Sequence, residues 1–348
     1  MVVRVPLGTS ADTPRQGVFD GMPTPLYAGS PSRLLAFLHC PRRYRFQYLD
    51  SPRPAPRPQR AHTSIGIATH NALRNWWDLP RRERTASAGA ALLRQAWIEV
   101  GFRDSDQSER WQRTVAGEVY AYLRTVDPDH QPRGIERTVA LRTGVLALAG
   151  RVDRIDERDG ELVIVDYKTS RRACTVEEAR TSLPLALYAA AAARMFRRRC
   201  VRVELHHVPT NTVAAHTHTS ESLQRKVDEA DSIAREVREA DASFGAEGAI
   251  SSSFPPLPSG LCTWCDYRAA CPEGQQMGPE KSSWAALELD DRRANDERRT
   301  HGESGPEAVD RTCNPVAVGV GAGGGQPEGR GGQDHLGREP RSGVRGAG

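Results

Sequence analysis

The chain has few lysines and no long apolar run. Only three of its 48 basic residues are lysine (Lys168, Lys226 and Lys281), so arginine is its ordinary cation. The longest apolar runs are much too short to cross a bilayer, and none has the flanks of a signal peptide. We therefore expect a cytoplasmic protein without a membrane partner, in which a lysine at a chemically meaningful position is informative.

Apolar side chains are also sparse, at 38% of 348 residues, and the net charge is only +4. This charge permits a nucleic-acid partner without arguing strongly for one. The sequence has no Gly-x₄-Gly-Lys-Ser/Thr phosphate loop, which excludes a helicase that uses this motif. The seven cysteines are spaced as metal ligands rather than as the framework of a disulfide scaffold.

The hydrophobic periodicity divides the chain into three parts. Residues 1–28 are predicted to be a flexible leader, and the polar, glycine-rich residues 276–348 a disordered tail. Between them the pattern changes from helical to strand periodicity and back, which is typical of an α/β domain over residues 29–275. Its main expected elements are helices at 64–77, 87–100 and 107–126, strands at 135–142, 144–156 and 161–168, a long Ala/Leu helix at 176–196 and a strand at 201–208.

A hairpin is predicted where Asp159-Gly160 separates two alternating apolar segments. If these two residues form the turn, Asp153 faces Asp166, and their Cβ atoms lie roughly 4.5–5.5 Å apart on one face of the sheet. Lys168, two residues after Asp166, lies on the same face. A register slip of one residue would send the two carboxylates to opposite faces.

Two carboxylates held this close repel each other unless a cation lies between them, and such oxygen ligands suit Mg²⁺ or Mn²⁺. A nearby lysine can stabilise the charge that develops on a phosphoryl oxygen. The alternative is an ordinary surface hairpin with solvated charges. The surrounding Leu-Val-Ile-Val segment favours burial instead, because a buried carboxylate without a partner is costly.

The segment Gly150–Asp156, followed by Ile164–Ser170, resembles the PD-(D/E)XK nuclease superfamily, in the form seen in RecB-family exonucleases. The resemblance implies that Asp153, Asp166 and the Tyr167 carbonyl bind the metal, and that Lys168 assists the attacking water. It also implies a central mixed sheet flanked by helices. The expected function is Mg²⁺-dependent DNA exonuclease activity in repair or recombination, on single-stranded DNA or free ends, with a helicase subunit as a candidate partner. The alternative is a DNA-end-binding module of a repair or CRISPR-adaptation complex, with weak or no cleavage.

Three further positions are weighed against the same family. His70, one turn after Gly66, matches its additional metal-binding histidine, although a lone histidine on a helix is more often structural. Tyr188 matches the tyrosine of the family's Gln-x-x-x-Tyr motif, but Pro184 stands where the glutamine is expected. Glu136 is a candidate acidic ligand, for which a solvated strand end is the favoured interpretation.

The cysteine cluster Cys262-x₂-Cys265-x₅-Cys271, with Cys40 as fourth ligand, suits either zinc or a [4Fe–4S] cluster. Spacing alone favours zinc, as in a zinc-stapled structural or adaptor protein. The resemblance to AddB-type and CRISPR-adaptation nucleases implies a [4Fe–4S] cluster, in a lobe that joins the N- and C-terminal parts. The remaining cysteines have no assigned role and are Cys174, Cys200 and Cys313.

Two arginine groups are candidate DNA contacts. The first surrounds Cys40 and alternates with aromatic residues, which suits phosphate contacts and base stacking or, equally, a solvated helix face with its aromatics in the core. This group consists of Arg42, Arg43 and Arg45 with Tyr44 and Phe46. The second, Arg171 and Arg172, directly follows the Asp-Tyr-Lys strand and is expected to lie near the scissile backbone.

Overall fold

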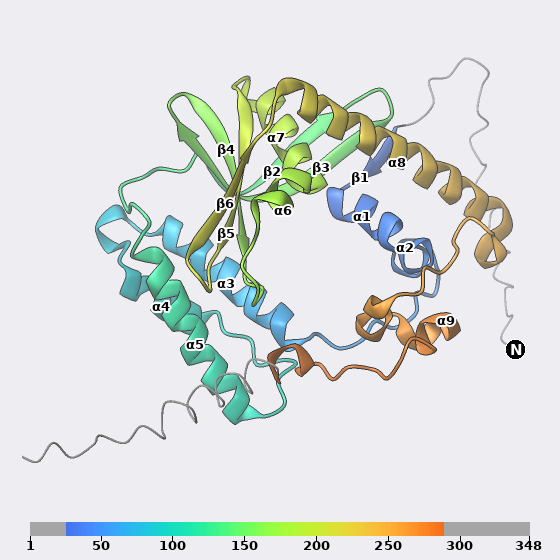
Figure 1. Cartoon of the computed structure of the whole chain (residues 1–348), viewed down its shortest axis with the longest axis horizontal. Coiled ribbons are helices and arrows are strands. Elements are labelled where there is room, and N and C mark those ends of the chain that lie inside the picture. The colour runs from blue at the N-terminus through green and yellow to red at the C-terminus, as the bar shows by residue number, and fades with distance from the viewer. Residues whose placement is uncertain (1–25, 289–348) are drawn as a thin grey trace, which may run out of the picture. The chain divides into compact units, whose positions relative to one another are not determined.

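The computed structural model describes residues 26–288, which form a mixed sheet with helices on both faces (Figure 1). The strands are β1 (Tyr27–Gly29), β2 (Gly134–Arg142), β3 (Leu146–Arg158), β4 (Glu161–Lys168), β5 (Cys200–His207) and β6 (Thr212–Thr217). The α-helices are α1 (Pro31–His39), α2 (Pro41–Tyr48), α3 (Ala61–Asp78), α4 (Ala86–Gln95), α5 (Ser105–Leu123), α6 (Val176–Thr181), α7 (Leu183–Phe196), α8 (Ser220–Glu247) and α9 (Pro272–Gln275). The α/β fold and the mixed sheet are therefore confirmed.

The sheet is built around β3 and β4. The strand order is β1-β3-β4-β5-β6, with β2 paired along β3, and the β1–β3 and β4–β5 pairs are parallel while the others are antiparallel. The apolar residues 162–165 of β4 are each at most 3% exposed. Burying each of these side chains contributes roughly 1.5–3 kcal/mol, so β4 is a firm support for residues at its end.

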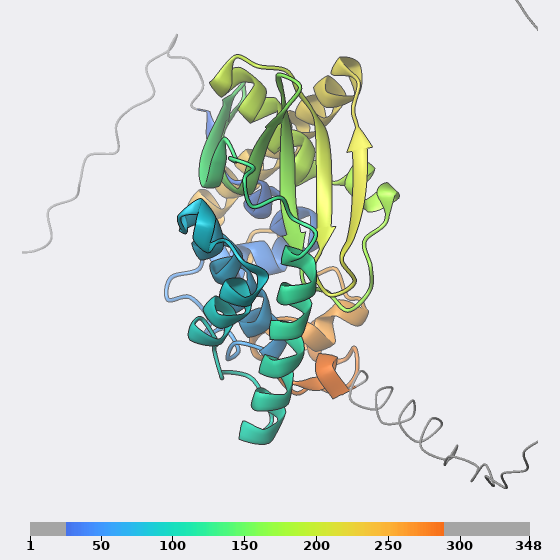
Figure 2. The same cartoon turned by 90° about the vertical axis from the view of Figure 1, so that its left-hand side faces the viewer.

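Two apolar cores cover the two faces of the sheet. On one face, α1, α7 and α8 pack against alternate β4 residues such as Leu162 and Ile164. On the other face, α3, α4 and α5 pack against Val163, Val165 and Tyr167. Figure 2 shows α3, α4 and α5 gathered together below the sheet. Because side chains alternate along a strand, Asp166 and Lys168 belong to the α7 face and Tyr167 to the α3 face.

The predicted long helix at 176–196 is two helices, α6 and α7, that meet at Ser182. Ser182 has ψ 105°, and its side chain accepts a hydrogen bond from the Leu185 N–H, which makes it the N-cap of α7. Pro184 then occupies the first turn of α7, where no backbone N–H partner is needed. A continuous helix would require a hydrogen bond from the backbone N–H of residue 184. Proline has no such N–H, so the helix breaks just before it.

Both predicted domain boundaries differ from the structure. Tyr27 and Ala28, predicted to lie in the leader, belong to β1, and Tyr27 is buried. Residues 276–288, predicted to begin the tail, return to the domain, because the Ala61 N–H donates to the Ser283 carbonyl (3.1 Å) and Leu287 is 1% exposed. The rest of the predicted leader and tail, residues 1–25 and 289–348, lies outside the described residues. No described helix is long and apolar enough to cross a membrane.

Candidate active site

The predicted hairpin positions the acidic residues. Asp159 and Gly160 have φ values of 51° and 78°, the left-handed conformation that a two-residue hairpin turn requires. The pairing runs from Arg158–Glu161 to Arg154–Val165, which is the predicted register. Asp153 and Asp166 follow at the next position, where Asp153 Oδ2 accepts a hydrogen bond from the Tyr167 N–H (2.8 Å). The hairpin and its register are therefore as the sequence predicts.

Asp166 and Lys168 form an ion pair in which Nζ lies 2.7 Å from Oδ2. Burial is the main cause of the raised pKa of Asp166; Lys168 opposes this rise and Asp153 adds to it. Burial disfavours the Lys168 ammonium, but Asp166 outweighs burial and raises the pKa of Lys168 above its usual value. The ammonium group is therefore held charged beside the carboxylate pair.

His70, on α3, reaches the same centre from the other side. Its Nδ1 lies 3.4 Å from Asp153 Oδ1, and its Nε2–H donates to the Tyr167 carbonyl oxygen (3.1 Å). Burial disfavours the charged imidazole, yet the hydrogen bond to Asp153 leaves the pKa of His70 raised. The structure thus brings His70, Asp153 and the Tyr167 carbonyl together, as the family resemblance implies.

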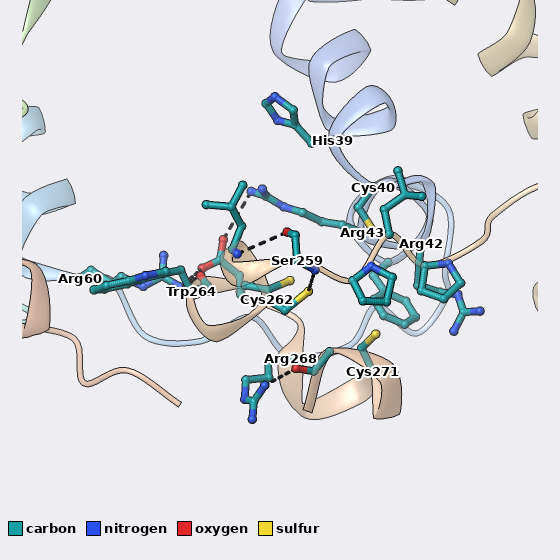
Figure 3. A pocket seen from close by; sticks show the side chains of 18 residues that line it. His39, Cys40, Arg42, Arg43, Arg60, Ser259, Cys262, Trp264, Arg268 and Cys271 are labelled. Carbon is teal, nitrogen blue, oxygen red and sulfur yellow. Dashed lines mark hydrogen bonds and ion pairs between the residues drawn. The ribbon is translucent and has the colours of Figure 1, made fainter. Parts of the chain in front are cut away.

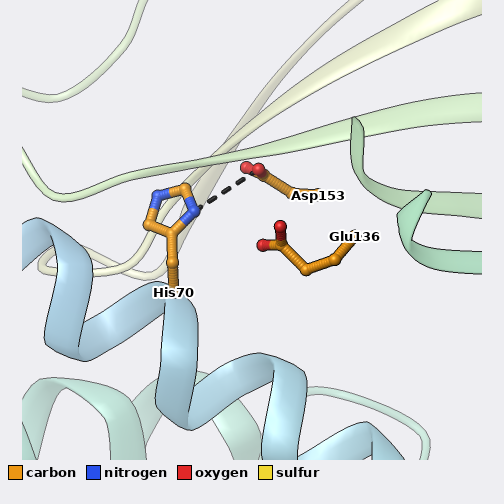
Figure 4. Close-up of side chains that lie close together, drawn as sticks. All are labelled: His70, Glu136 and Asp153. Carbon is orange, nitrogen blue, oxygen red and sulfur yellow. Dashed lines mark ion pairs between the residues drawn. The ribbon is translucent and has the colours of Figure 1, made fainter. Parts of the chain in front are cut away.

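Glu136 joins this group, although the favoured interpretation of the sequence was a solvated strand end. It stands across from Asp153 on β2, and ligand atoms of His70, Glu136 and Asp153 lie within 4.8 Å of one another (Figure 4). Its backbone has φ 47°, which is uncommon for a residue with a side chain and costs of order 1–3 kcal/mol. Strain of this size at a cluster of potential metal ligands is typical of a functional position.

Near Glu136, whose backbone is left-handed, the side chains of β2 and β3 stop alternating regularly between the α7 face and the α3 face of the sheet. On β2, Val139 and Leu141 face α7, whereas the odd-numbered Ile135 packs with the α3 core. On β3, Val152 and Ile155 both pack in the α7 core, so the alternation changes there as well. The acidic centre therefore lies where two paired strands exchange faces, which allows α3 and α7 to approach it from opposite sides.

Tyr188 closes the centre from α7. Its ring lies directly over β3, because a Cβ on Gly150 would come within 2.5 Å of the Tyr188 ring. Burial raises the pKa of Tyr188 to about 12, and Asp166 and Asp153 contribute to this rise. The phenol is therefore a neutral donor in the field of both carboxylates. Pro184, one turn earlier, supplies no side-chain amide there.

The four predicted cluster cysteines line one cavity of about 240 Å³ between the N- and C-terminal parts of the domain (Figure 3). They come from Cys40, at the start of α2, and from Cys262, Cys265 and Cys271. The last three sulfurs each accept a backbone N–H, from Ser259, Tyr267 and Gly274 respectively. Burial raises the pKa of the Cys265 and Cys271 thiols, and these N–H groups, which favour the thiolate, offset only part of that rise.

The arginines around Cys40 form contacts within the protein, in or near the cysteine lobe. Tyr44 and Phe46 are buried, so the core interpretation of these aromatics is confirmed. Arg45 is buried as well and pairs with Asp50 (3.1 Å). Arg42 and Arg43 line the cysteine cavity and form ion pairs with Glu273 (3.7 Å) and Asp266 (3.8 Å), respectively.

The second arginine group is paired with neighbouring acids. Arg171 forms an ion pair with Glu118 (2.9 Å) and stacks on Trp111, and Arg172 pairs with Glu178. These partners fix the loop after β4. Arg171 is therefore held against α5, whereas Arg172 forms a surface pair in which its side chain is 73% exposed.

Of the cysteines without an assigned role, one lies near the acidic centre. Lys168 and Cys174 influence each other's titration, and burial is the main cause of the raised pKa of the Cys174 thiol. Cys200 is buried in β5, and burial raises its pKa to about 12. Cys313 lies outside the described residues. Position in sequence alone gives no signal for the proximity of Cys174 to Lys168.

One comparison with known proteins identifies the family. A model of the PD-(D/E)XK nuclease superfamily matches residues 28–272, well over half of the chain. No curated protein sequence matches the chain significantly. Among solved structures, one titled "Crystal structure of SSO0001" shares 15% identity over 60% of this chain and 84% of that chain, with a TM-score of 0.27.

Proposed function

Because the chain belongs to the PD-(D/E)XK nuclease superfamily, we propose that it is a metal-dependent DNA exonuclease of the RecB type that acts in repair or recombination. The observation that carries this proposal is that ligand atoms of His70, Glu136 and Asp153 lie within 4.8 Å of one another, with the Asp166–Lys168 ion pair at the end of the neighbouring strand β4. PD-(D/E)XK nucleases use divalent metals. The donor set fits such an ion.

Charge and ligand chemistry support Mg²⁺ or Mn²⁺ at this centre. With Glu136, Asp153 and Asp166 ionised and Lys168 protonated, the centre has a net charge of −2, which a divalent cation would neutralise. Carboxylate oxygens, the Tyr167 carbonyl oxygen and one His70 nitrogen would hold it. When bound, the ion supplies Lewis acidity for phosphodiester hydrolysis.

The protein's own groups would divide the remaining work. Lys168 holds its ammonium beside the carboxylates, where it can hydrogen-bond the attacking water and offset negative charge on the phosphoryl oxygens. Tyr188 would orient the scissile strand from α7, with its hydroxyl kept protonated. The Trp77 and Arg154 side chains hold the Tyr167 hydroxyl (3.1 and 3.0 Å), which fixes the strand carrying the carbonyl ligand.

A cleavage assay with end-labelled single- and double-stranded DNA tests the proposal. Wild type should degrade DNA only with Mg²⁺ or Mn²⁺, whereas Asp166→Asn and Lys168→Ala should each lose at least about a hundredfold in rate. Lys226→Ala is the matched control, because Lys226 pairs with Glu229 on α8, outside the centre, and its rate should not change. Metal-dependent cutting that survives in Asp166→Asn would refute the assignment.

One observation favours a DNA-end-binding module as second candidate. Pro184 replaces the glutamine of the family's helix motif, so the centre lacks one side chain that would orient the substrate. In that case wild type binds labelled ends tightly in the same assay but leaves them uncut. Restoring the amide with Pro184→Gln should then raise the cleavage rate.

We propose a [4Fe–4S] cluster in the cysteine cavity. Zinc holds four thiolates at about 2.3 Å, which places the sulfurs roughly 3.8 Å apart. Among the residues that the structure describes, no three of these sulfurs lie within 4.8 Å of one another, so their spacing supports a larger group. Four arginines line the cavity and would balance its negative charge: Arg42, Arg43, Arg60 and Arg268.

The cluster's proposed role is structural, and its test is spectroscopic. Protein purified anaerobically should be brown, absorb near about 400 nm and contain iron. Cys271→Ala should lose both signals, while Cys200→Ala, a buried cysteine outside the cavity, should keep them. A colourless protein that contains stoichiometric zinc would overturn this assignment without affecting that of the acidic centre.

A further inference from the structure

A second cavity of about 290 Å³ lies beside the end of the Asp-Tyr-Lys strand. Four separate parts of the chain form its walls: the start of α3, the loop after β4, the segment between Cys262 and Cys265, and the segment beyond the cysteines. The lining is largely apolar or aromatic, and it also includes a hydroxyl, an imidazole and the charged residue Arg171. The principal side chains are His62, Ile65, Thr169, Trp264, Ala286 and Leu287.

This cavity adjoins the acidic centre along α3. Thr169 directly follows Lys168, and a Cβ on Gly66 would lie 3.4 Å from Thr169 Oγ1, so helix and loop are in close contact. His62, Gly66 and His70 are spaced four residues apart and therefore share one face of α3. A DNA strand with its phosphate at His70 and Lys168 reaches the cavity by following this face.

Trp264 forms the wall that the cavity shares with the cysteine lobe. It lies between Cys262 and Cys265 and lines both cavities (Figure 3). Its ring meets His62 edge to face, with centroids 6.3 Å apart at 78°. Arg60 donates to the Trp264 carbonyl oxygen and pairs with Asp266 (2.9 Å), which fixes the backbone on either side.

The opposite wall is also fixed. The Ser170 carbonyl oxygen contacts His207 Nε2 (2.5 Å), and Leu287 is buried against the α3 core. The walls therefore need little reorganisation to accept a flat ligand, which reduces the cost of binding. An aromatic face beside a strand path is the usual way in which proteins hold an unpaired base.

We propose that this cavity receives one nucleobase of the DNA strand next to the scissile phosphate, with Trp264 as its stacking partner. The inference rests on the proposed nuclease function and narrows its substrate to a strand with an unpaired base at this position. Trp264 is a positioning residue, since it contacts the neighbouring base and not the reacting atoms.

Binding of short single strands without divalent cation tests the cavity separately from cleavage. In a series of strands with one abasic site at successive positions, wild type should show one position where affinity falls about five- to a hundredfold. Trp264→Ala should lose the same factor on the intact strand, and the abasic site at that position should then have no further effect. Trp264→Phe should restore most of the affinity.

Two further variants separate base stacking from damage to the lobe. Ala286→Trp fills the cavity from the wall away from the cysteines and should mimic Trp264→Ala, whereas Ala286→Ser should bind as wild type. Tyr120→Ala, which removes an exposed aromatic from α5, should also bind as wild type. Iron content checks that each variant keeps its lobe.

The outcomes distinguish the two proposals. Abasic sensitivity that persists in both Trp264→Ala and Ala286→Trp, or that is absent from wild type, overturns the base site alone. The expected pattern in a protein that never cuts DNA supports the base site and overturns the nuclease activity. A wild-type protein that binds no strand overturns both.

Discussion

The two faces of the β3–β4 hairpin differ in how completely their charged side chains are paired. On one face, Asp153, Asp166 and Lys168 meet Glu136 from β2, and negative charge is in excess. On the other face, Arg154 contacts Asp156 (3.0 Å) and the Tyr167 hydroxyl (3.0 Å), with its guanidinium 5.3 Å from the Trp77 ring centre. Adjacent residues of one strand thus build an unbalanced site and a closed network.

The closed network continues into β5. Glu204 pairs with Arg158 (2.8 Å), Arg202 (2.7 Å) and His206 (2.9 Å), and its side chain is 2% exposed. Buried charges that are fully paired hold the strands in place, whereas the excess of carboxylates opposite them favours the binding of a cation. The paired charges therefore stabilise the fold, whereas the excess carboxylates are available to bind a cation.

The largest effect is expected from Arg154→Met. The substitution takes away the buried partner of Asp156, which keeps only the more exposed Arg158 (2.7 Å) and His130 (3.1 Å), and should reduce the free energy of unfolding by about 3 kcal/mol. Arg137→Met, an exposed arginine on β2, should change it by less than about 0.5 kcal/mol. Urea unfolding measures both, and an Arg154→Met protein as stable as wild type would refute the structural role of this face.

Asp166→Asn should show the converse behaviour in metal-free protein. The substitution removes one of several crowded negative charges whose protonated form burial already favours. The free energy of unfolding without divalent cation should therefore stay equal or rise, and added Mn²⁺ should no longer stabilise the protein. Thermal unfolding with and without Mn²⁺ measures this, and a large loss of stability in the metal-free variant would contradict it.

Glu204→Gln tests the closed network through the pH dependence of the free energy of unfolding. Burial raises the pKa of Glu204, but hydrogen bonds from His206, Arg158 and Arg202 outweigh burial and hold the pKa far below its usual 4.5. Its contribution is then complete above pH 4.5 and is lost as the pH falls toward the folded-state value. Wild type should exceed Glu204→Gln by about 2 kcal/mol at pH 7, and the difference should shrink below pH 4.5. A constant difference would show that packing, not charge, is responsible.

A further effect is expected from Glu136→Gln. The variant keeps the size of the side chain but removes one negative charge from the candidate metal centre, so Mn²⁺ affinity should fall about 10- to 100-fold. Glu161→Gln is the control, because Glu161 lies at the hairpin turn and pairs with Arg199 (2.5 Å). Calorimetric titration compares the two, and equal affinities would exclude Glu136 as a ligand.

The sequence predicts most of what local chemistry determines. Asp159-Gly160 favours one turn type, which sets the register and hence the positions of Asp153, Asp166 and Lys168. The spacing of Cys262, Cys265 and Cys271 likewise predicts one ligand cluster, to which the family resemblance adds Cys40. These features depend on a few neighbouring residues or on the strict alternation of a strand.

Features set by tertiary contacts could not be predicted in this way. Glutamate has no preference for a left-handed backbone, so nothing marks Glu136 as the point where the alternation changes. Trp264 lies in a cysteine motif, which predicts its place beside the cysteine cavity. Its contact with the second cavity depends on packing against α3, which the motif does not predict. The pairing of Arg171 with Glu118 likewise depends on how α5 lies beside the sheet.

The cysteine cavity also sets an order of events during synthesis. Cys40 and Cys262 are 222 residues apart, and every proposed ligand of the acidic centre lies between them. At about 5–20 residues per second, ribosomes need roughly 10–45 seconds to cover that distance. The hairpin can form while Cys40 still has no partner, so the walls that Trp264 and then Leu287 provide are added later. The proposed base site would thus be complete only when synthesis of the domain is nearly finished.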